Sequence, residues 1–244
     1  MRAIVNATNA TVEPAVIDLA MWKLDQLAGA EDSVAGEATT NGVTALPIAR
    51  SAGLSSTGDA GSFSSQGWAG GSTDTNRYVS LGFTVAAGKR VFPADLLLTI
   101  GLPYTSGPAD YAVRYSGDNF QKNIATWNYK NQGAHMAVDL SKLGPLEGTV
   151  EFRIFVGSEL TYGGGTITGS AKFGLKNYSW TDSLKFTGSV ESADTPDIST
   201  LVPAKGQVGT RVAIRGAKLG GATKVTNGGA TANFQSGAND GEIL

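Results

Sequence analysis

Alternation of apolar and polar residues with a period of two dominates this chain. It is clearest over residues 78–85, in which every second residue is apolar: Val79, Leu81, Phe83 and Val85. This spacing places the apolar side chains on one face of a strand. Six further segments are predicted as strands: 95–102, 110–116, 123–129, 149–158, 170–180 and 183–190. Because clusters of Gly, Pro, Asp and Asn separate most of them, the pattern predicts an all-β protein, an antiparallel sandwich.

Three segments depart from this simple pattern. Residues 12–30 place apolar side chains at helical spacing, at Val16, Ala20, Leu24 and Leu27. The alternation around Trp22 also fits a strand, but composition favours a helix here. Residues 33–76 are predicted as mostly loop with two or three short strands, and residues 139–148 are predicted to hold a single helical turn.

The composition of the sequence changes near residue 191. The segment ESADTPD is polar and contains a proline, and the chain after it is rich in Gly, Thr and Val without Trp or Tyr. A length of 244 residues is compatible with two domains. The predicted organisation is an N-terminal arm, a large sandwich, a linker and a small second domain, at residues 1–15, 16–190, 191–195 and 196–244.

Composition excludes several function classes. The 19 basic and 21 acidic residues give a net charge of −2, so we expect no attraction to nucleic acid. No apolar run approaches the length of a membrane span, and we expect no membrane insertion. The absence of cysteine excludes disulfides and Cys-ligated zinc. With only 16% charged residues, solubility depends on hydroxyl and amide groups, as is common in β-rich extracellular proteins.

The segment PDISTLVPAKGQVGTRVAIRGAKLGGATKV, residues 196–225, resembles the start of an IPT/TIG domain. This small immunoglobulin-like sandwich occurs in many bacterial surface proteins. Pro203 and Gly206 suit its first turn, and Val212 and Ile214 suit the inward face of the following strand. The resemblance covers little more than half of such a domain. It therefore implies a partial domain, either a fragment of something longer or a subunit completed by another chain.

The first 190 residues are similar to the jelly-roll-like sandwich at the front of many exported bacterial multidomain proteins. The segments LAMWKLDQLAG, DTNRYVSLGFTVAAGKRV and DSLKFTGSV carry this resemblance. In those proteins the opening segment with the tryptophan is a strand, which implies a strand over residues 16–25. The resemblance also implies an extracellular or cell-surface location. Since the first residues lack the features of a secretory signal, we expect that signal either to have been removed or to lie outside this chain.

The sequence offers no catalytic constellation. His135 is the only histidine, and no nucleophile elbow accompanies it, so we expect it to be a surface residue. Glu147, Glu151 and Glu159 could in principle provide the carboxylate pair of a glycoside hydrolase. Charged residues on the solvent face of a strand explain them more simply. No catalytic residue is predicted, and we do not expect an enzyme.

Two loops carry oxygen ligands suited to calcium. Asp74 and Asn76 lie in one loop, and Asp118 and Asn119 lie in another. Carboxylate, amide and carbonyl oxygens are the ligands that calcium takes in proteins. Ordinary Asx turns are the alternative interpretation of both loops. A structural calcium ion is the only cofactor that the sequence suggests.

Aromatic residues raise the prospect of a sugar site, because their flat faces stack on the apolar faces of pyranose rings. Tyr104 and Tyr162 lie in glycine-flanked loops and are the predicted glycan-binding residues. Trp127 is among the other aromatic residues that could contribute to such a site, but core packing accounts for most of the tryptophans.

The favoured function is a non-catalytic module of an extracellular bacterial surface protein, acting in adhesion or surface structure. Its expected partners are other protein chains or copies of itself, with polysaccharide as a further ligand. The arm of one copy could add as a strand to the unfinished second domain of the next copy. The alternative is a glycan-binding accessory module of a larger secreted enzyme, such as a hydrolase or nuclease.

Overall fold

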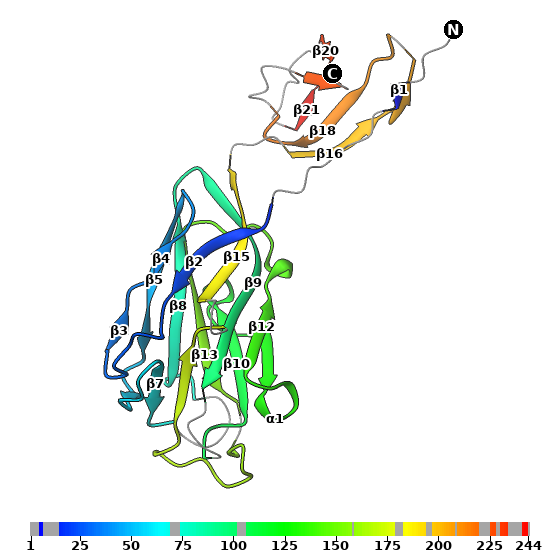
Figure 1. Cartoon of the computed structure of the whole chain (residues 1–244). Coiled ribbons are helices and arrows are strands. Elements are labelled where there is room, and N and C mark those ends of the chain that lie inside the picture. Colours follow the sequence, from blue (N-terminus) through cyan, green and yellow to red (C-terminus); the bar gives the residue numbers. More distant parts are fainter. Residues whose placement is uncertain are drawn as a thin grey trace. The chain divides into compact units, whose positions relative to one another are not determined.

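The computed structural model describes residues 5–6, 15–68, 74–101, 106–157, 159–178, 183–193, 197–207, 209–219, 225–227, 230–233 and 241–243. The chain is all-β with antiparallel sheets, which confirms the predicted fold class (Figure 1). It divides into two units: Pro14–Glu191 forms one, and Met1–Glu13 together with Ser192–Leu244 forms the other. None of the helices in the described ranges is long and apolar enough to cross a membrane.

The larger unit is a sandwich-like pair of sheets. The first sheet contains, in order, β11 (Ala125–Asn128), β10 (Asp110–Tyr115), β13 (Thr149–Val156), β8 (Tyr78–Val85), β5 (Val43–Arg50) and β3 (Ser33–Val34). The second contains β4 (Glu37–Ala38), β2 (Ile17–Trp22), β15 (Leu184–Ser192), β9 (Lys89–Gly101), β14 (Phe173–Lys176), β7 (Phe63–Gln66) and β6 (Ser55–Ser56). A further strand, β12 (His135–Asp139), pairs with β9. Since Thr99 of β9 pairs with both His135 and Lys176, β12 and β14 lie on opposite edges of β9.

The strands predicted from alternation are all present, and β8 has the predicted bounds. β9 begins at Lys89, earlier than predicted, because the turn after β8 leads directly into it. The helical turn predicted within residues 139–148 is the 3-10 helix η2 (Ser141–Leu143). Residues 33–76 contain more strands than the two or three predicted, since β3 to β7 all lie there. Most of these strands have only two to four residues and show no alternation to read.

The helix favoured by composition over residues 12–30 is wrong. The segment forms β2, as the resemblance implied, and β2 pairs with β15 and β4. The Trp22 ring is fully buried against Phe186, and its Nε1 donates a hydrogen bond to the Leu46 carbonyl at 3.0 Å. Sheet pairing and burial of this indole outweigh a weak helical spacing, because propensity yields to tertiary context.

Three phenylalanine rings join the two sheets. Phe83 of β8 and Phe152 of β13 come from the first sheet, and Phe186 of β15 comes from the second. The Phe186 centroid lies 5.2 Å from that of Phe83 and 4.9 Å from that of Phe152. All three are buried, and such rings each bury about 150–250 Å² of surface. This cluster fixes the distance between the two sheets and therefore the positions of their edge strands.

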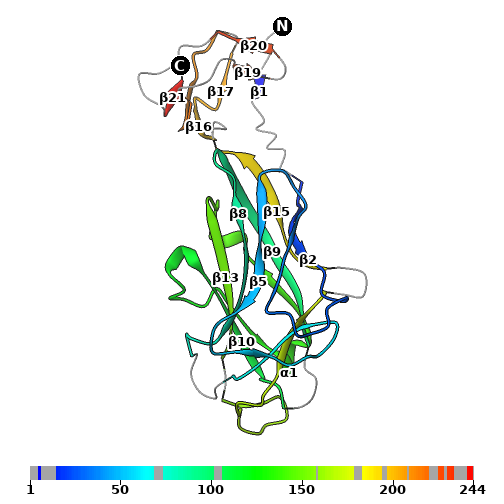
Figure 2. The same cartoon turned by 90° about the vertical axis from the view of Figure 1, so that its left-hand side faces the viewer.

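The smaller unit is built from short antiparallel pairings (Figure 2). Its three-stranded sheet contains β16 (Asp197–Val202), β18 (Ala213–Ala217) and β21 (Glu242–Ile243). A hairpin joins β19 (Val225–Asn227) to β20 (Ala230–Ala232). The last pair joins β1 (Val5–Asn6) to β17 (Lys205–Gly206), so these two residues of the N-terminal arm pair within their own chain. Val212 and Ile214 are half-buried.

Gly82 is the position in β8 that a larger residue would disturb most directly. A Cβ atom added there would lie 2.1 Å from the Val150 carbonyl oxygen of β13. Backbone cannot move aside without breaking the pairing of the two strands. We therefore expect Gly82→Ala to lower the free energy of unfolding by about 1–3 kcal/mol in urea denaturation. Gly157→Ala, whose Cβ would make only ordinary contacts, should change it by less than about 0.5 kcal/mol. Equal stabilities for the two variants would contradict this packing.

Candidate functional site

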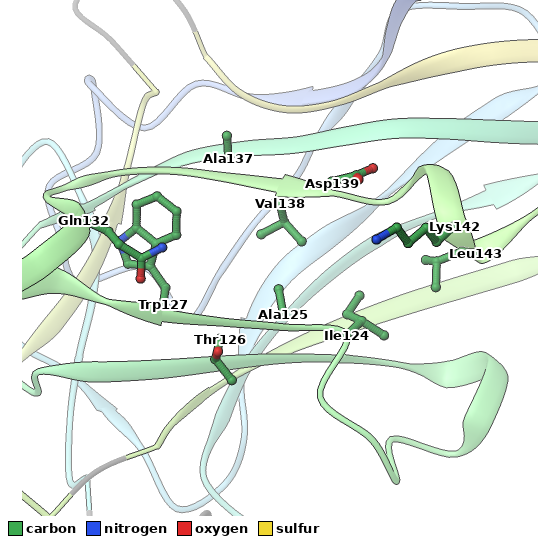
Figure 3. A pocket seen from close by; sticks show the side chains of 10 residues that line it. All are labelled: Ile124, Ala125, Thr126, Trp127, Gln132, Ala137, Val138, Asp139, Lys142 and Leu143. Carbon is green, nitrogen blue, oxygen red and sulfur yellow. The ribbon is translucent and has the colours of Figure 1, made fainter.

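A groove of about 390 Å³ lies between the edge strands β11 and β12 (Figure 3). Among the described strands, β11 pairs only with β10 and β12 pairs only with β9. Each strand therefore ends its sheet on one side. The short helix α1 (Tyr129–Gln132) connects the two strands at one end of the groove, and η2 lies at the other. The groove is thus an open side of the sandwich.

The floor of the groove is apolar and continuous with the core. Ala125 and Trp127 are paired with Val113 and Tyr111 of β10, which are buried in the core. Paired residues share a face, so Ala125 and Trp127 also face the inside of the sandwich. Figure 3 shows Ala125 turned toward Val138 of β12 across the gap, and the Trp127 ring in the same gap beside Gln132. The groove can therefore hold an apolar surface of a ligand.

Peptide groups of β12 add hydrogen-bonding capacity to the wall of the groove. The Ala134 carbonyl accepts from Ile100 N–H at 2.8 Å, and Leu140 N–H donates to the Ala94 carbonyl at 2.8 Å. Peptide groups alternate between the two edges of a strand. The N–H and C=O of Ala137 therefore point away from β9, toward the groove, while its side chain points to solvent.

The turn at α1 fixes the aromatic end of the groove. The Asn128 side chain caps α1 by accepting from Asn131 N–H at 2.9 Å. Gly133 ends the helix with φ +81°, a conformation that favours glycine. The Gly133 carbonyl accepts from Trp127 Nε1 at 2.9 Å, which holds the indole in place. Gln132 Oε1 accepts from Asn128 N–H at 2.7 Å, and within the described ranges the Gln132 Nε2 amide has no hydrogen-bond partner.

Charged groups lie at the other end. Asp139 Oδ1 accepts hydrogen bonds from both the hydroxyl and the N–H of Ser141, at 2.6 and 2.9 Å. These bonds, with a smaller contribution from the positive charge of Lys142, lower the pKa of the Asp139 carboxyl. Lys142 reaches along the groove from η2, and no described side chain forms an ion pair with it (Figure 3). The carboxylate and the ammonium group together leave this end close to neutral.

Of the two predicted glycan-binding tyrosines, the structure describes Tyr162, which does not line this groove. Tyr104 lies outside the described residues. Tyr162 is 38% exposed and packs edge-on against Tyr129, with ring centroids 5.2 Å apart. Its N–H donates to the Gly107 carbonyl at 2.8 Å, so Tyr162 belongs to a loop cluster beside α1. Glycan binding by either tyrosine stays a prediction.

The carboxylates proposed as calcium ligands both close turns. Asp74 accepts from Asn76 N–H at 2.9 Å and forms an ion pair with Arg77. Asp118 accepts from the N–H groups of Gln121 and Lys122, each at 3.1 Å. Asn119 follows with φ +57°. Across the described residues, no three Asp, Glu or His side chains gather in a way that could hold a metal ion. Calcium binding by these two loops stays a prediction.

Other polar residues singled out in the sequence have structural partners. His135 is exposed, and its Nδ1 lies 2.7 Å from the Tyr178 carbonyl oxygen, to which it donates. Glu151 accepts a hydrogen bond from Arg153 Nε at 2.7 Å on the same strand. His135 therefore ties β12 to the segment that follows β14, and the charge of Glu151 is balanced within β13.

Comparison with known proteins found no matching family model, no matching curated protein and no matching solved structure. The fold class therefore depends on the strand pairing described above, and the function has to be argued from the site. Trp127 is the site residue that the sequence analysis did not select, because core packing explains most tryptophans and the loop tyrosines were preferred. The sequence did contain a signal for it. Asn128, a capping residue, and Gly133 mark a single helical turn directly after this tryptophan.

The hydrogen bonds from Ser141 give a measurable electrostatic prediction. We expect the pKa of Asp139, measured by NMR titration, to lie below the ordinary aspartate range and to rise in Ser141→Ala. A carboxyl whose pKa is lowered by folding stabilises the fold above its unfolded pKa, and this contribution is lost as pH falls through the folded value. Ser55→Ala, an exposed serine on β6, is the control and should leave the Asp139 pKa unchanged. An unchanged pKa in Ser141→Ala would refute the assignment.

Proposed function

We propose that this chain is a non-catalytic module of an extracellular bacterial surface protein, acting in adhesion through the groove between β11 and β12. The groove carries the proposal because it combines an apolar floor, a fixed indole and unpartnered polar groups. All of these lie on strands and short helical turns held by the core. Binding sites supported in this way keep their geometry without a ligand.

The proposal includes the domain identities that the sequence resembles. Residues 16–190 would be a jelly-roll-like sandwich, and residues 196–244 a partial IPT/TIG domain with an immunoglobulin-like arrangement. Two antiparallel sheets in the larger unit and the β16–β18 pairing in the smaller unit support this assignment. The hydroxyl- and amide-rich surface supports an extracellular or cell-surface location.

Self-assembly by strand addition is a second candidate function, and the β1–β17 pair favours it. The pair joins the backbone of Val5–Asn6 to that of Lys205–Gly206. The corresponding residues of a second copy offer the same groups, so β1 can pair with its own chain or with a neighbour. A head-to-tail contact of this kind extends into a fibre.

Light scattering of the full chain over a concentration series tests this assembly. Pairing within a chain does not depend on concentration, whereas pairing between copies does. We expect the mean mass of the full chain to rise with concentration and that of a variant lacking residues 1–13 to stay at one chain. The same mass for both proteins at every concentration would remove strand addition as a function.

Co-sedimentation of the full chain with insoluble surfaces tests adhesion. The panel contains isolated bacterial envelopes, insoluble polysaccharides and beads coated with extracellular-matrix protein. We expect saturable binding to at least one surface, with no release of sugar, peptide or nucleotide products. Absence of binding to every surface would contradict the function, and turnover of any substrate would contradict its non-catalytic nature.

A glycan-binding accessory role within a larger secreted enzyme is the alternative to a surface module. The Trp127 ring in the groove favours this alternative over a purely structural role. Both readings use the same binding surface, and they differ in the polypeptide of which the module is part.

A further inference from the structure

We infer that the β11–β12 groove binds a neutral polysaccharide, with one pyranose ring stacked on the indole of Trp127. The inference rests on the proposed function, since it names the ligand of the proposed binding surface. It differs from the sequence-based assignment, which placed glycan binding on Tyr104 and Tyr162.

The indole is suited to stacking because its position is set before a ligand arrives. Trp127 is half-buried, so part of the ring is accessible from the groove. Its Nε1–H is already bonded to the Gly133 carbonyl, and its body packs on the core. An aromatic ring with few remaining degrees of freedom contributes contact area at low entropic cost. The C–H face of a pyranose covers such a ring, and the half-buried Ala125 extends the apolar surface beside it.

Hydroxyl groups along the bound stretch of polymer find partners at both ends of the groove. The Gln132 Nε2 amide and the Lys142 ammonium group are donors without partners among the described residues. The peptide group of Ala137 supplies a donor and an acceptor at the edge of β12. A hydroxyl both donates and accepts, so sugar hydroxyls can bond to the donors and to the acceptor alike. A mixture of an apolar platform with a few placed polar groups is typical of ligand sites.

Charge selects a neutral sugar over an acidic one. Lys142 alone would attract an anion, but the ionised Asp139 carboxylate lies close enough to interact with it. The two charges offset each other at this end of the groove. The chain as a whole carries a net charge of −2, which adds no attraction for acidic polymers. The volume of about 390 Å³ lies near the lower end of the usual 300–1,000 Å³ range for ligand pockets, so a short stretch of the polymer occupies it.

Isothermal titration calorimetry of the full chain with soluble hexasaccharides tests the inference. The probes are cellohexaose, chitohexaose, mannohexaose and laminarihexaose as neutral glycans, and a galacturonate hexamer as the acidic one. We expect at least one neutral probe to bind and the acidic probe to bind more weakly. Truncation of the platform in Trp127→Ala should weaken binding by about tenfold or more, as is typical of a central aromatic contact.

Two exposed glutamines, one inside the groove and one outside it, separate a loss of binding from a loss of folding. Gln132→Ala removes the amide in the groove and should weaken binding severalfold. Gln121→Ala removes an exposed amide that also bonds to backbone, outside the groove, and should leave binding unchanged. Thermal melting of each variant, monitored by circular dichroism, verifies that the fold is retained; should Trp127→Ala be unfolded, the glutamine pair decides the outcome.

The outcomes separate the inference from the proposed function. If the chain sediments with some surface in the adhesion test but no neutral hexasaccharide binds, the inference is wrong and adhesion stands. Tighter binding of the acidic probe, binding confined to protein-coated beads, or equal effects of the two glutamine variants would each overturn it. Absence of binding to every surface and every probe would refute both.

Discussion

Two stacked sheets cover each other's apolar faces but cannot cover their own edges. In this protein the rings of Phe83, Phe152 and Phe186 hold the sheets together, and the rest of the larger unit follows from that contact. On one side the first sheet ends at β11 and β12 lies at an edge of the second, without a further strand described between them. Exposed sheet edges carry unpaired peptide groups and are natural places for binding another molecule.

The chain uses local turns to shape this open side. Asn128 and Gly133 confine α1 to a single turn, which places Gln132 beside the indole of Trp127. Asp139 and Ser141 shape the start of η2, which directs Lys142 along the groove from the opposite end. The polar groups of the site are thus products of helix and turn capping, and the apolar floor is a product of sheet packing. Neither alone would form a binding surface.

The sequence predicted the fold class because alternation is a local signal. β8 was predicted to the residue, since each of its apolar side chains faces the core. β2 was misjudged from composition because Trp22 reaches its buried position only through pairing with β15 and β4. The short strands between residues 33 and 66 depend wholly on their neighbours and leave no pattern to read.

The candidate site was less predictable, for a physical reason. Trp127 and Lys142 are 15 positions apart in the sequence. They line one groove only because β12 pairs with β9 and so lies across the gap from β11. Tyrosines in glycine-rich loops appeared more accessible in the sequence than a tryptophan within a strand. A strand at the end of a sheet, however, leaves one side of such a ring uncovered, and the order of strands in a sheet is not a local property.

An NMR titration would test the central claim most directly. Amide and indole resonances of the full chain would be followed as the tightest-binding neutral hexasaccharide is added. The account predicts that the largest shifts occur at the Trp127 indole N–H, the Gln132 side-chain amide and the backbone N–H of Ala137. Shifts centred on Tyr162 and its neighbouring loops, with the groove residues unchanged, would contradict it.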